Sequence, residues 1–387
     1  AGNGATPEWI SQPMFMKQAC LADSAAAIRE ALAVPVMAVG RINGPEIADR
    51  ILAEGMADLV CIGRGLLADP NMPKKAREGR LDEIRTCIAC NTCMESIFRK
   101  GRVECLVNPA LGREREMVLS PADPVKKVMV VGGGPGGLDV AWVAAKRGHE
   151  VHLYEKQDSL GGQLLLGSVS SYKKELLTLI EYQKKQVQKH GVRCHLGSAV
   201  TPETVAEVRP DVVVLATGSV PNLPPVPGID LSIVRSVSEV FQDGRPPAIR
   251  RSVVIGGGAT GCEVSLHLAE AGCPVILVEK MRRIGHQIES VTRKMILAAL
   301  RDRNVTVMTG TELLRIEPRG VAVRSRDTGE HLLEADQVIV VTGMRPDNTL
   351  YNEVVQMGIP VYQIGDCLEP RSAKAAIHEG SMIGRKI

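Results

Sequence analysis

The chain has 387 residues, enough for two or three domains, and its 47 Lys and Arg nearly balance its 44 Asp and Glu. Such a balance gives no strong field to recruit nucleic acid, and no basic patch is interleaved with aromatic residues. No apolar run reaches the roughly twenty residues that span a bilayer, and no leader pattern precedes the first expected helix. We therefore expect a globular, cytoplasmic protein without a membrane span or a nucleic-acid partner. Because the sequence opens at Ala1 in mid-motif, we also expect a piece of a longer polypeptide.

The first 86 residues contain two strand-helix units. Apolar runs at 34–39 and 58–62 predict strands, and Pro45 opens a helical pattern between them. Glycines after successive strands leave backbone N–H groups free to approach a phosphate, as in the last units of a (β/α)8 barrel, although glycines end strands in many folds. A complete barrel needs roughly 250 residues, so we expect 1–86 to be its last units, with a small open sheet as the alternative. The glycines and the arginines that follow them are Gly40, Arg41, Gly63 and Arg64.

Four of the ten cysteines lie within nineteen residues, at Cys87, Cys90, Cys93 and Cys105. Thiolates packed this closely suit an iron-sulfur cluster or zinc, while disulfides or scattered core cysteines are the structural alternatives. Structural zinc sites usually show two separated cysteine pairs, whereas three close cysteines and a remote one are commoner for a cubane. The spacing therefore favours a 4Fe-4S cluster. Prolines at 121 and 124 end this loop and linker, which we place at 87–124.

A strand expected at 127–131 runs into a glycine-rich turn and a helix that ends near Gly148. In this context Gly132 permits the tight turn, Gly134 lets the backbone approach a pyrophosphate, and Gly137 lets the helix pack on the strand. Glu155, after the second strand, is placed to accept the ribose hydroxyls. The four residues form a complete dinucleotide fingerprint.

The same pattern recurs 124 residues later, with Gly256, Gly258, Gly261 and Glu279 in the equivalent positions. A chance repeat would not preserve both the glycines and the acid. Two fingerprints with the same spacing between the glycines and the acid predict two domains that bind two different nucleotides.

Three further buried strands place the second nucleotide domain inside the first. The strand at 211–215 ends in a Thr-Gly pair, the strand at 338–341 ends similarly, and the strand at 361–364 runs into a Gly-Asp pair. We therefore expect one domain over 125–235 and 341–387, with a second at 236–340. Asp366 would reach the ribityl and pyrophosphate region of a flavin, unless it occupies a solvent-exposed turn. The cofactor-binding candidates here are Gly162, Gln163, Val200, Thr217, Gly218, Gly365 and Asp366.

Together these motifs resemble the NADH:flavin oxidoreductases with an old-yellow-enzyme barrel, a family that includes 2,4-dienoyl-CoA reductase, 2-enoate reductase and trimethylamine dehydrogenase. The resemblance implies an α/β fold: the C-terminal remnant of the barrel, an iron-sulfur loop, and a Rossmann-like FAD domain with an inserted NAD(P)H domain. It covers nearly the whole chain. The residues that carry it are 40–42, 63–70, the four cysteines, 107–109, 132–137 and 160–163.

The resemblance also implies cofactors and their ligands. The four cysteines would hold the 4Fe-4S cluster, and the two Gly-Arg pairs would meet the phosphate of FMN, whose site is incomplete in this chain. The family's proton-donating tyrosine and histidine would lie upstream of Ala1, so no catalytic residue is assigned. The two residues between the second and third cysteines match trimethylamine dehydrogenase, but the intact second fingerprint favours the reductive direction.

The leading hypothesis is therefore a reductase in which NADH reduces FAD, and electrons cross the cluster to FMN and reduce an activated C=C bond of an unsaturated acid or acyl-CoA. The alternatives are an electron-transfer module for a partner protein, an amine dehydrogenase-like enzyme and a nucleotide-sensing scaffold. A disulfide reductase is disfavoured, because 160–163 contains no cysteine. Candidate partners besides the substrate are a second copy of the chain and a redox protein. Glu279 favours NADH, whereas Lys280, Arg282 and Arg283 would suit NADPH.

Overall fold

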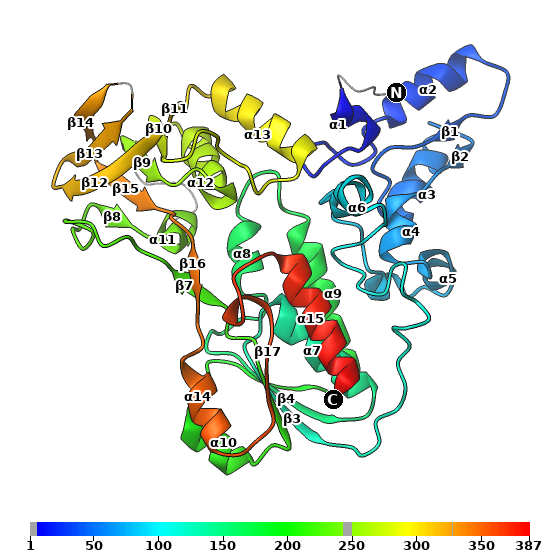
Figure 1. Ribbon diagram of the computed structural model, residues 1–387. Coiled ribbons are helices and arrows are strands. Elements are labelled where there is room, and N and C mark those ends of the chain that lie inside the picture. The colour runs from blue at the N-terminus through cyan, green and yellow to red at the C-terminus, as the bar shows by residue number, and fades with distance from the viewer. Residues whose placement is uncertain (1–5, 243–249, 327) are drawn as a thin grey trace. The chain divides into compact units, whose positions relative to one another are not determined.

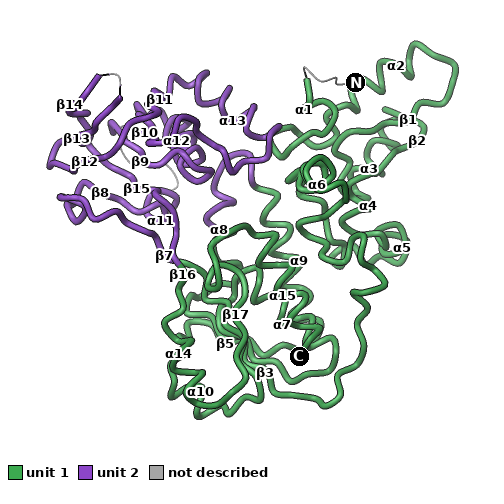
Figure 2. Tube along the Cα trace, in the orientation of Figure 1, with its two compact units in different colours: residues 1–165, 174–219, 346–387 green, residues 166–173, 220–345 purple. Residues whose placement is uncertain are grey.

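The computed structural model describes residues 6–242, 250–326 and 328–387 and divides the chain into two compact units (Figure 2). Unit 1 contains residues 1–165, 174–219 and 346–387, and unit 2 contains residues 166–173 and 220–345. The chain thus leaves unit 1 for unit 2 and returns, as expected for an inserted domain. The boundaries expected at 235/236 and 340/341 remain a prediction.

The N-terminal part of unit 1 contains two strands that pair in parallel, Met37 beside Leu59 and Ala38 beside Val60. Each is shorter than the apolar run that predicted it, because neither strand has a second neighbour to bond among the described residues. Val34 and Val39 are 59% and 50% exposed. The elements are α1 (Pro7–Ile10), α2 (Ala22–Ala31), β1 (Met37–Ala38), α3 (Pro45–Ala53), β2 (Leu59–Val60), α4 (Arg64–Ala68), α5 (Met72–Arg77), η1 (Leu81–Glu83) and α6 (Thr92–Lys100).

The rest of unit 1 is built on a five-stranded parallel sheet of order β17-β6-β3-β4-β5. Its strands β3, β4 and β17 are labelled in Figure 1. Val128 and Val130 of its central strand pack with α7 and α9, while Met129 and Val131 pack with α10 and α14 on the other face. A parallel sheet covered on both faces is buried, which explains the continuous apolar strands. The elements are β3 (Lys127–Val131), α7 (Pro135–Lys146), β4 (Glu150–Tyr154), α9 (Leu176–Lys189), β5 (Arg193–His195), α10 (Pro202–Val208), β6 (Val212–Leu215), α14 (Thr349–Gln356), β17 (Val361–Gln363), η2 (Gly365–Cys367) and α15 (Ala373–Lys386). Two further elements, α8 (Gln163–Gly167) and β7 (Ser219–Pro221), begin in unit 1 and end in unit 2.

Unit 2 repeats this plan with a five-stranded parallel sheet of order β11-β10-β9-β15-β8 and adds an antiparallel three-stranded sheet, β12-β13-β14. Because β17 pairs with β6 of unit 1 after the chain has left unit 2, the expected fold class, with one nucleotide domain inserted in the other, is confirmed. The elements are β8 (Val234–Arg235), α11 (Val237–Gln242), β9 (Ser252–Ile255), α12 (Ala259–Glu270), β10 (Val275–Glu279), α13 (Ser290–Asp302), β11 (Thr306–Thr309), β12 (Thr311–Glu317), β13 (Gly320–Ser325), β14 (Gly329–Glu334), β15 (Gln337–Val340) and β16 (Met344–Pro346).

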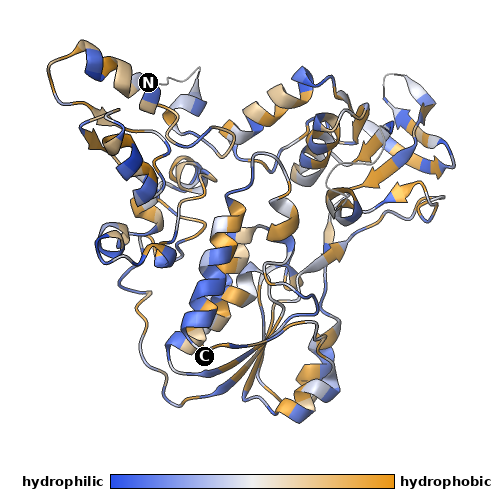
Figure 3. Ribbon diagram, turned by 180° about the vertical axis from the view of Figure 1, so that it is seen from behind, coloured by the Kyte–Doolittle hydropathy of each residue, from blue (hydrophilic) through white to orange (hydrophobic). Residues whose placement is uncertain are grey.

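Helices of the molecule carry hydrophilic and hydrophobic residues side by side (Figure 3). Among the described residues, none of these helices is both long enough and apolar enough to cross a bilayer.

One carboxyl group is buried in the helix layer of unit 1. Asp139 of α7 is 4% exposed and accepts a hydrogen bond of 2.9 Å from the indole N–H of Trp142. Burial raises the pKa of Asp139 to about 6, against the lowering effects of Trp142, Arg85, Gln183 and Arg385.

Candidate functional site

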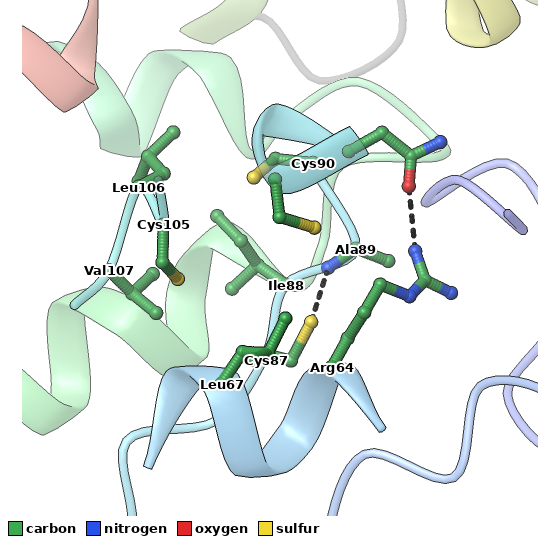
Figure 4. Close-up of a pocket in the computed structure, with 11 residues that line it drawn as sticks. Arg64, Leu67, Cys87, Ile88, Ala89, Cys90, Cys105, Leu106 and Val107 are labelled. Atoms are coloured by element: carbon green, nitrogen blue, oxygen red, sulfur yellow. Dashed lines mark hydrogen bonds between the residues drawn. The ribbon is translucent and has the colours of Figure 1, made fainter. Parts of the chain in front are cut away.

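The four clustered cysteines line one cavity in unit 1 (Figure 4). Its empty volume is ≈ 310 Å³, part of which is open to solvent. The rest of the wall is mostly apolar. The lining residues are Arg64, Leu67, Cys87, Ile88, Ala89, Cys90, Asn91, Cys93, Cys105, Leu106 and Val107.

The tight turns of the cysteine loop depend on two residues in the left-handed region, Ala89 at φ 48° and Asn91 at φ 57°. The second of these residues ends the loop and α6 begins at Thr92. Two polar groups already meet sulfur: the Ala89 N–H donates to Cys87 Sγ at 3.4 Å, and the Cys90 thiol donates to Thr92 Oγ1 at 3.3 Å. N–H groups aimed at sulfur are typical partners of metal-bound thiolates.

Burial controls the protonation of these thiols. It raises the pKa of Cys87 to about 12 and that of Cys105 to about 11, and it also raises the pKa of Cys90 and Cys93. The positive charge of Arg64 opposes the increase at Cys87, Cys90 and Cys93. Without a bound cation the cavity therefore favours neutral thiols, and a metal would have to displace their protons.

Both flanks of unit 1 hold the loop in place. On the side of the short parallel strands, the Asn43 amide donates to the Cys87 carbonyl at 2.8 Å, and the Asn108 amide donates to the Leu67 carbonyl at 2.9 Å. On the side of the five-stranded sheet, His378 of α15 lies 2.8 Å from the Cys105 carbonyl through its Nε2 atom. The loop is thus fixed to both parts of the unit.

The donor set of the cavity fits an iron-sulfur cluster by its chemistry, because four thiols and no competing carboxylate line the wall. In the described part of the chain, no three His, Cys, Asp or Glu side chains are grouped closely enough to hold a metal ion as they stand. All ten cysteines are free thiols. Binding a cluster would therefore require the four cysteine sulfurs, which already line the cavity, to move closer together.

The two Gly-Arg pairs follow neighbouring parallel strands, so their backbones lie at the same edge of the small sheet. Open space surrounds the position where a Cβ would stand on Gly63, whereas Gly40 lies against Leu21. The Arg41 side chain is 1% exposed; it forms an ion pair with Glu175 and donates to the Met16 carbonyl. Arg41 is therefore already occupied inside the protein, which the sequence did not reveal.

The first dinucleotide fingerprint has the packing that its glycines predicted. A Cβ on Gly137 would lie 1.9 Å from the Gly132 carbonyl oxygen, so only glycine allows α7 this close to β3. Gly134 caps α7 and faces open space, where a pyrophosphate would approach. Glu155 is 8% exposed and accepts the Gly133 N–H at 2.7 Å. The acid thus holds the glycine turn as well as standing where a ribose would bind.

The second fingerprint, in unit 2, reproduces these contacts. A Cβ on Gly261 would lie 1.8 Å from the Gly256 carbonyl oxygen, while Gly258 has only an ordinary contact nearby. Glu279 accepts the N–H groups of Gly257 and Met281, both at 2.6 Å. Lys280, Arg282 and Arg283, which follow it, are exposed.

The remaining flavin candidates of unit 1 meet at a residue that the sequence did not single out. Gln163 Nε2 donates to Ser219 Oγ at 3.1 Å, and the same hydroxyl donates to Asp366 at 3.1 Å. Ser219 directly follows the Thr-Gly pair, which is the signal that could have found it. Val200 does not join this group, because it packs beside the hydrophobic cluster of α10 and α14.

Thr217, Gly218 and Gly365 are tied to the chain around them. Thr217 donates its hydroxyl to the Asp347 carbonyl, and the Gly218 carbonyl accepts the Asp347 N–H at 3.0 Å. The Gly365 N–H donates to Glu379 at 2.7 Å, a second partner that the sequence did not indicate. Gly162 is in the left-handed region at φ 54°, and a Cβ there would lie 2.9 Å from the Cα of Gly134. Gly162 therefore lies beside the first fingerprint.

A nucleotide fingerprint on the parallel sheet of each unit, together with a cysteine-lined cavity in unit 1, is typical of flavin- and pyridine nucleotide-dependent oxidoreductases. The chain belongs to the pyridine nucleotide-disulphide oxidoreductase family, whose pattern matches residues 126–380. Residues 5–83 match part of the NADH:flavin oxidoreductase / NADH oxidase family. These two matches confirm the family predicted from the sequence.

Proteins of similar sequence and structure align with nearly all of the chain. It is 38% identical to an NADH oxidase of Thermoanaerobacter brockii over 98% of its length, and 31% identical to a cinnamate reductase of Clostridium sporogenes over 98%. A solved structure of 2-naphthoyl-CoA reductase with 2-naphthoyl-CoA superimposes on 97% of the chain with a TM-score of 0.93 and 33% identity. The chain spans 59%, 57% and 58% of these three proteins, respectively.

Proposed function

We propose that this chain oxidises NADH and delivers the electrons toward the reduction of an activated carbon-carbon double bond. When bound, FAD supplies a hydride acceptor, a 4Fe-4S cluster supplies one-electron transfer, and FMN supplies the hydride donor to the substrate. The observation that carries the proposal is the cavity lined by Cys87, Cys90, Cys93 and Cys105, in the same unit as the first dinucleotide fingerprint.

The residues of the chain would bind and orient these groups. The N–H groups at the start of α7 and the open space at Gly134 suit the pyrophosphate of FAD, with Asp366 and Gln163 held together by Ser219 beside it. The equivalent helix start at Gly258 suits NADH, where Glu279 would favour the two ribose hydroxyls over a 2′-phosphate. The exposed positive charges after it would have to be screened for that preference to hold.

The substrate class is proposed from the relatives. The cinnamate reductase is named for an unsaturated acid and the solved structure contains 2-naphthoyl-CoA, an acyl-CoA, so we propose an unsaturated acid or acyl-CoA for the protein to which this chain belongs. The Gly40 and Gly63 backbones, at one sheet edge, would meet the FMN phosphate. The 387 residues alone should reduce a soluble dye with NADH but not reduce an enoate.

Purification under anaerobic conditions followed by iron, sulfide, zinc and flavin analysis tests the proposal. We expect iron and sulfide in a cluster ratio, with the broad visible absorbance of the cluster, and their loss in Cys90→Ala. Cys194→Ala is the matched control, because this cysteine is exposed and lies outside the cavity. Zinc without iron in the wild-type protein would overturn the proposal.

The alternative is NADH oxidation with delivery of electrons to a separate acceptor, which the similarity to an NADH oxidase favours. Flavin identification distinguishes the two, since only the reductase requires FMN in the longer protein. The alternative would be supported if the full-length protein contains FAD and an iron-sulfur cluster but binds no FMN and reduces no double bond.

A further inference from the structure

The wall of the cysteine cavity contains an unneutralised positive charge. Of the lining residues in the described part of the chain, Arg64 alone is charged, and it forms no ion pair with any described carboxylate. Arg41, the equivalent arginine after the first strand, differs because Glu175 neutralises it. The two arginines look equivalent in the sequence and are electrostatically different in the structure.

Arg64 is held by neutral oxygen atoms only. Its Nη1 donates to the Asn91 side-chain oxygen at 2.6 Å, drawn as a dashed line in Figure 4, and to the Gln12 carbonyl at 2.8 Å. Hydrogen bonds to amide oxygens fix the position of a guanidinium without removing its charge. Without FMN the arginine therefore keeps a full charge at a fixed place on the wall, whereas an FMN phosphate at the second Gly-Arg pair would share that charge.

The side chain of Asn91 is itself held in place where it binds Arg64. Asn91 is 1% exposed, and both ends of its side chain are bonded: the oxygen also accepts the Ser11 hydroxyl at 3.0 Å, and the amide donates to the Ser11 carbonyl at 2.9 Å. It stands between two of the cysteines, at a left-handed position that asparagine tolerates well. The residue that turns the cysteine loop is thus the residue that holds the arginine.

We propose that Arg64, positioned by Asn91, is an electrostatic determinant of the redox potential of the group bound by the four cysteines, and that it makes this group easier to reduce. The inference rests on the proposed function, because it requires a cluster in the cavity. Four thiolates give a cluster net negative charge, and reduction adds one more electron. A fixed cation in a partly dehydrated wall stabilises the reduced form more than the oxidised form, since little water screens it.

The test is the midpoint potential of the cluster in the anaerobically purified 387-residue protein, free of FMN and measured by EPR-monitored redox titration. Arg64→Gln should shift the potential to a more negative value, whereas Arg64→Lys should restore most of it, since charge rather than shape is responsible. Arg99→Gln is the matched control: it removes a positive charge whose side chain is 70% exposed on α6, and should leave the potential unchanged.

Two substitutions at Asn91 cover the case in which Arg64→Gln does not fold. Asn91→Asp keeps the left-handed backbone and places a carboxylate against the arginine, so the potential should also become more negative. Asn91→Gly keeps the backbone but releases the arginine, and an intermediate shift is expected.

The possible results distinguish a failure of the proposed role of Arg64 from a failure of the proposed function. A wild-type protein that contains no iron overturns both. Iron at the wild-type level in Asn91→Asp or Arg64→Gln, with a potential no different from that of Arg99→Gln, overturns the electrostatic role alone and leaves the proposed function intact.

Discussion

Two neighbouring glycines of the first fingerprint should respond to the same added methyl group in opposite ways. At Gly134 the backbone is extended, with φ −74° and ψ −178°, and apart from the adjoining backbone no atom lies within 4 Å of a built Cβ. We expect Gly134→Ala to change the free energy of unfolding of the flavin-free protein by less than about 1 kcal/mol, because a weaker helix cap offsets the reduced chain entropy.

At Gly137 the same methyl group would lie 1.9 Å from a carbonyl oxygen, where ordinary contact begins at 3.4 Å. Helix α7 would have to move away from β3, and we expect Gly137→Ala to cost about 3 kcal/mol or more of folding free energy. Gly134→Ala should instead lose FAD affinity, by about 1–3 kcal/mol or roughly 5- to 150-fold, because its methyl group occupies the space of the pyrophosphate.

Chemical denaturation of the flavin-free proteins and fluorescence titration with FAD measure the two quantities separately. Gly258→Ala, the equivalent change in unit 2, is the control: it should leave FAD binding unchanged and raise the KM for NADH. Wild-type FAD affinity in a folded Gly134→Ala protein would refute the placement of the pyrophosphate at this turn.

Three further substitutions test other parts of the account. The folded-state pKa of Asp139, about 6, lies above the ordinary 3.8, so the stability linked to its protonation is fully present below about pH 4 and is lost as the pH rises through 6. Asp139→Asn should therefore be more stable than wild type by roughly 1–3 kcal/mol at pH 8 and show little gain at pH 4, and an equal difference at both values would contradict this. Glu175→Gln should lower the free energy of unfolding by about 2–4 kcal/mol, because it leaves the buried Arg41 charge without its partner; denaturant titration giving less than about 1 kcal/mol would show that the nearby carbonyls suffice. Glu279→Gln should reduce the preference for NADH over NADPH in steady-state kinetics, and a wild-type preference for NADPH would argue against the assigned role of the acid.

Glycine spacing predicted the nucleotide folds because it reflects a short-range steric requirement. The strand at 127–131 was predicted from its apolar run, and the insertion of one nucleotide domain in the other was predicted from the order of the buried strands. At Gly137 and Gly261 the space left for a side chain is nearly zero, so the pattern has little freedom to vary. Local rules of this kind can be read from the sequence without knowledge of the rest of the fold.

The contacts that join distant segments could not be predicted in the same way. Ser219 meets Asp366 across 147 residues of chain, and Arg41 meets Glu175 across 134. No periodicity links such pairs, because the folded backbone alone brings them together. The strands expected at 34–39 and 58–62 were too long for the related reason that an apolar run does not reveal how many neighbours a strand will have.

We propose that electrons from NADH reach a 4Fe-4S cluster held by Cys87, Cys90, Cys93 and Cys105. Low-temperature EPR of the anaerobic, FAD-loaded protein, frozen after addition of NADH, measures this directly. We expect the signal of a reduced 4Fe-4S cluster after NADH is added, and no such signal before the addition or in Cys90→Ala. Bleaching of the flavin by NADH with no cluster signal, in a wild-type protein that contains iron, would contradict it.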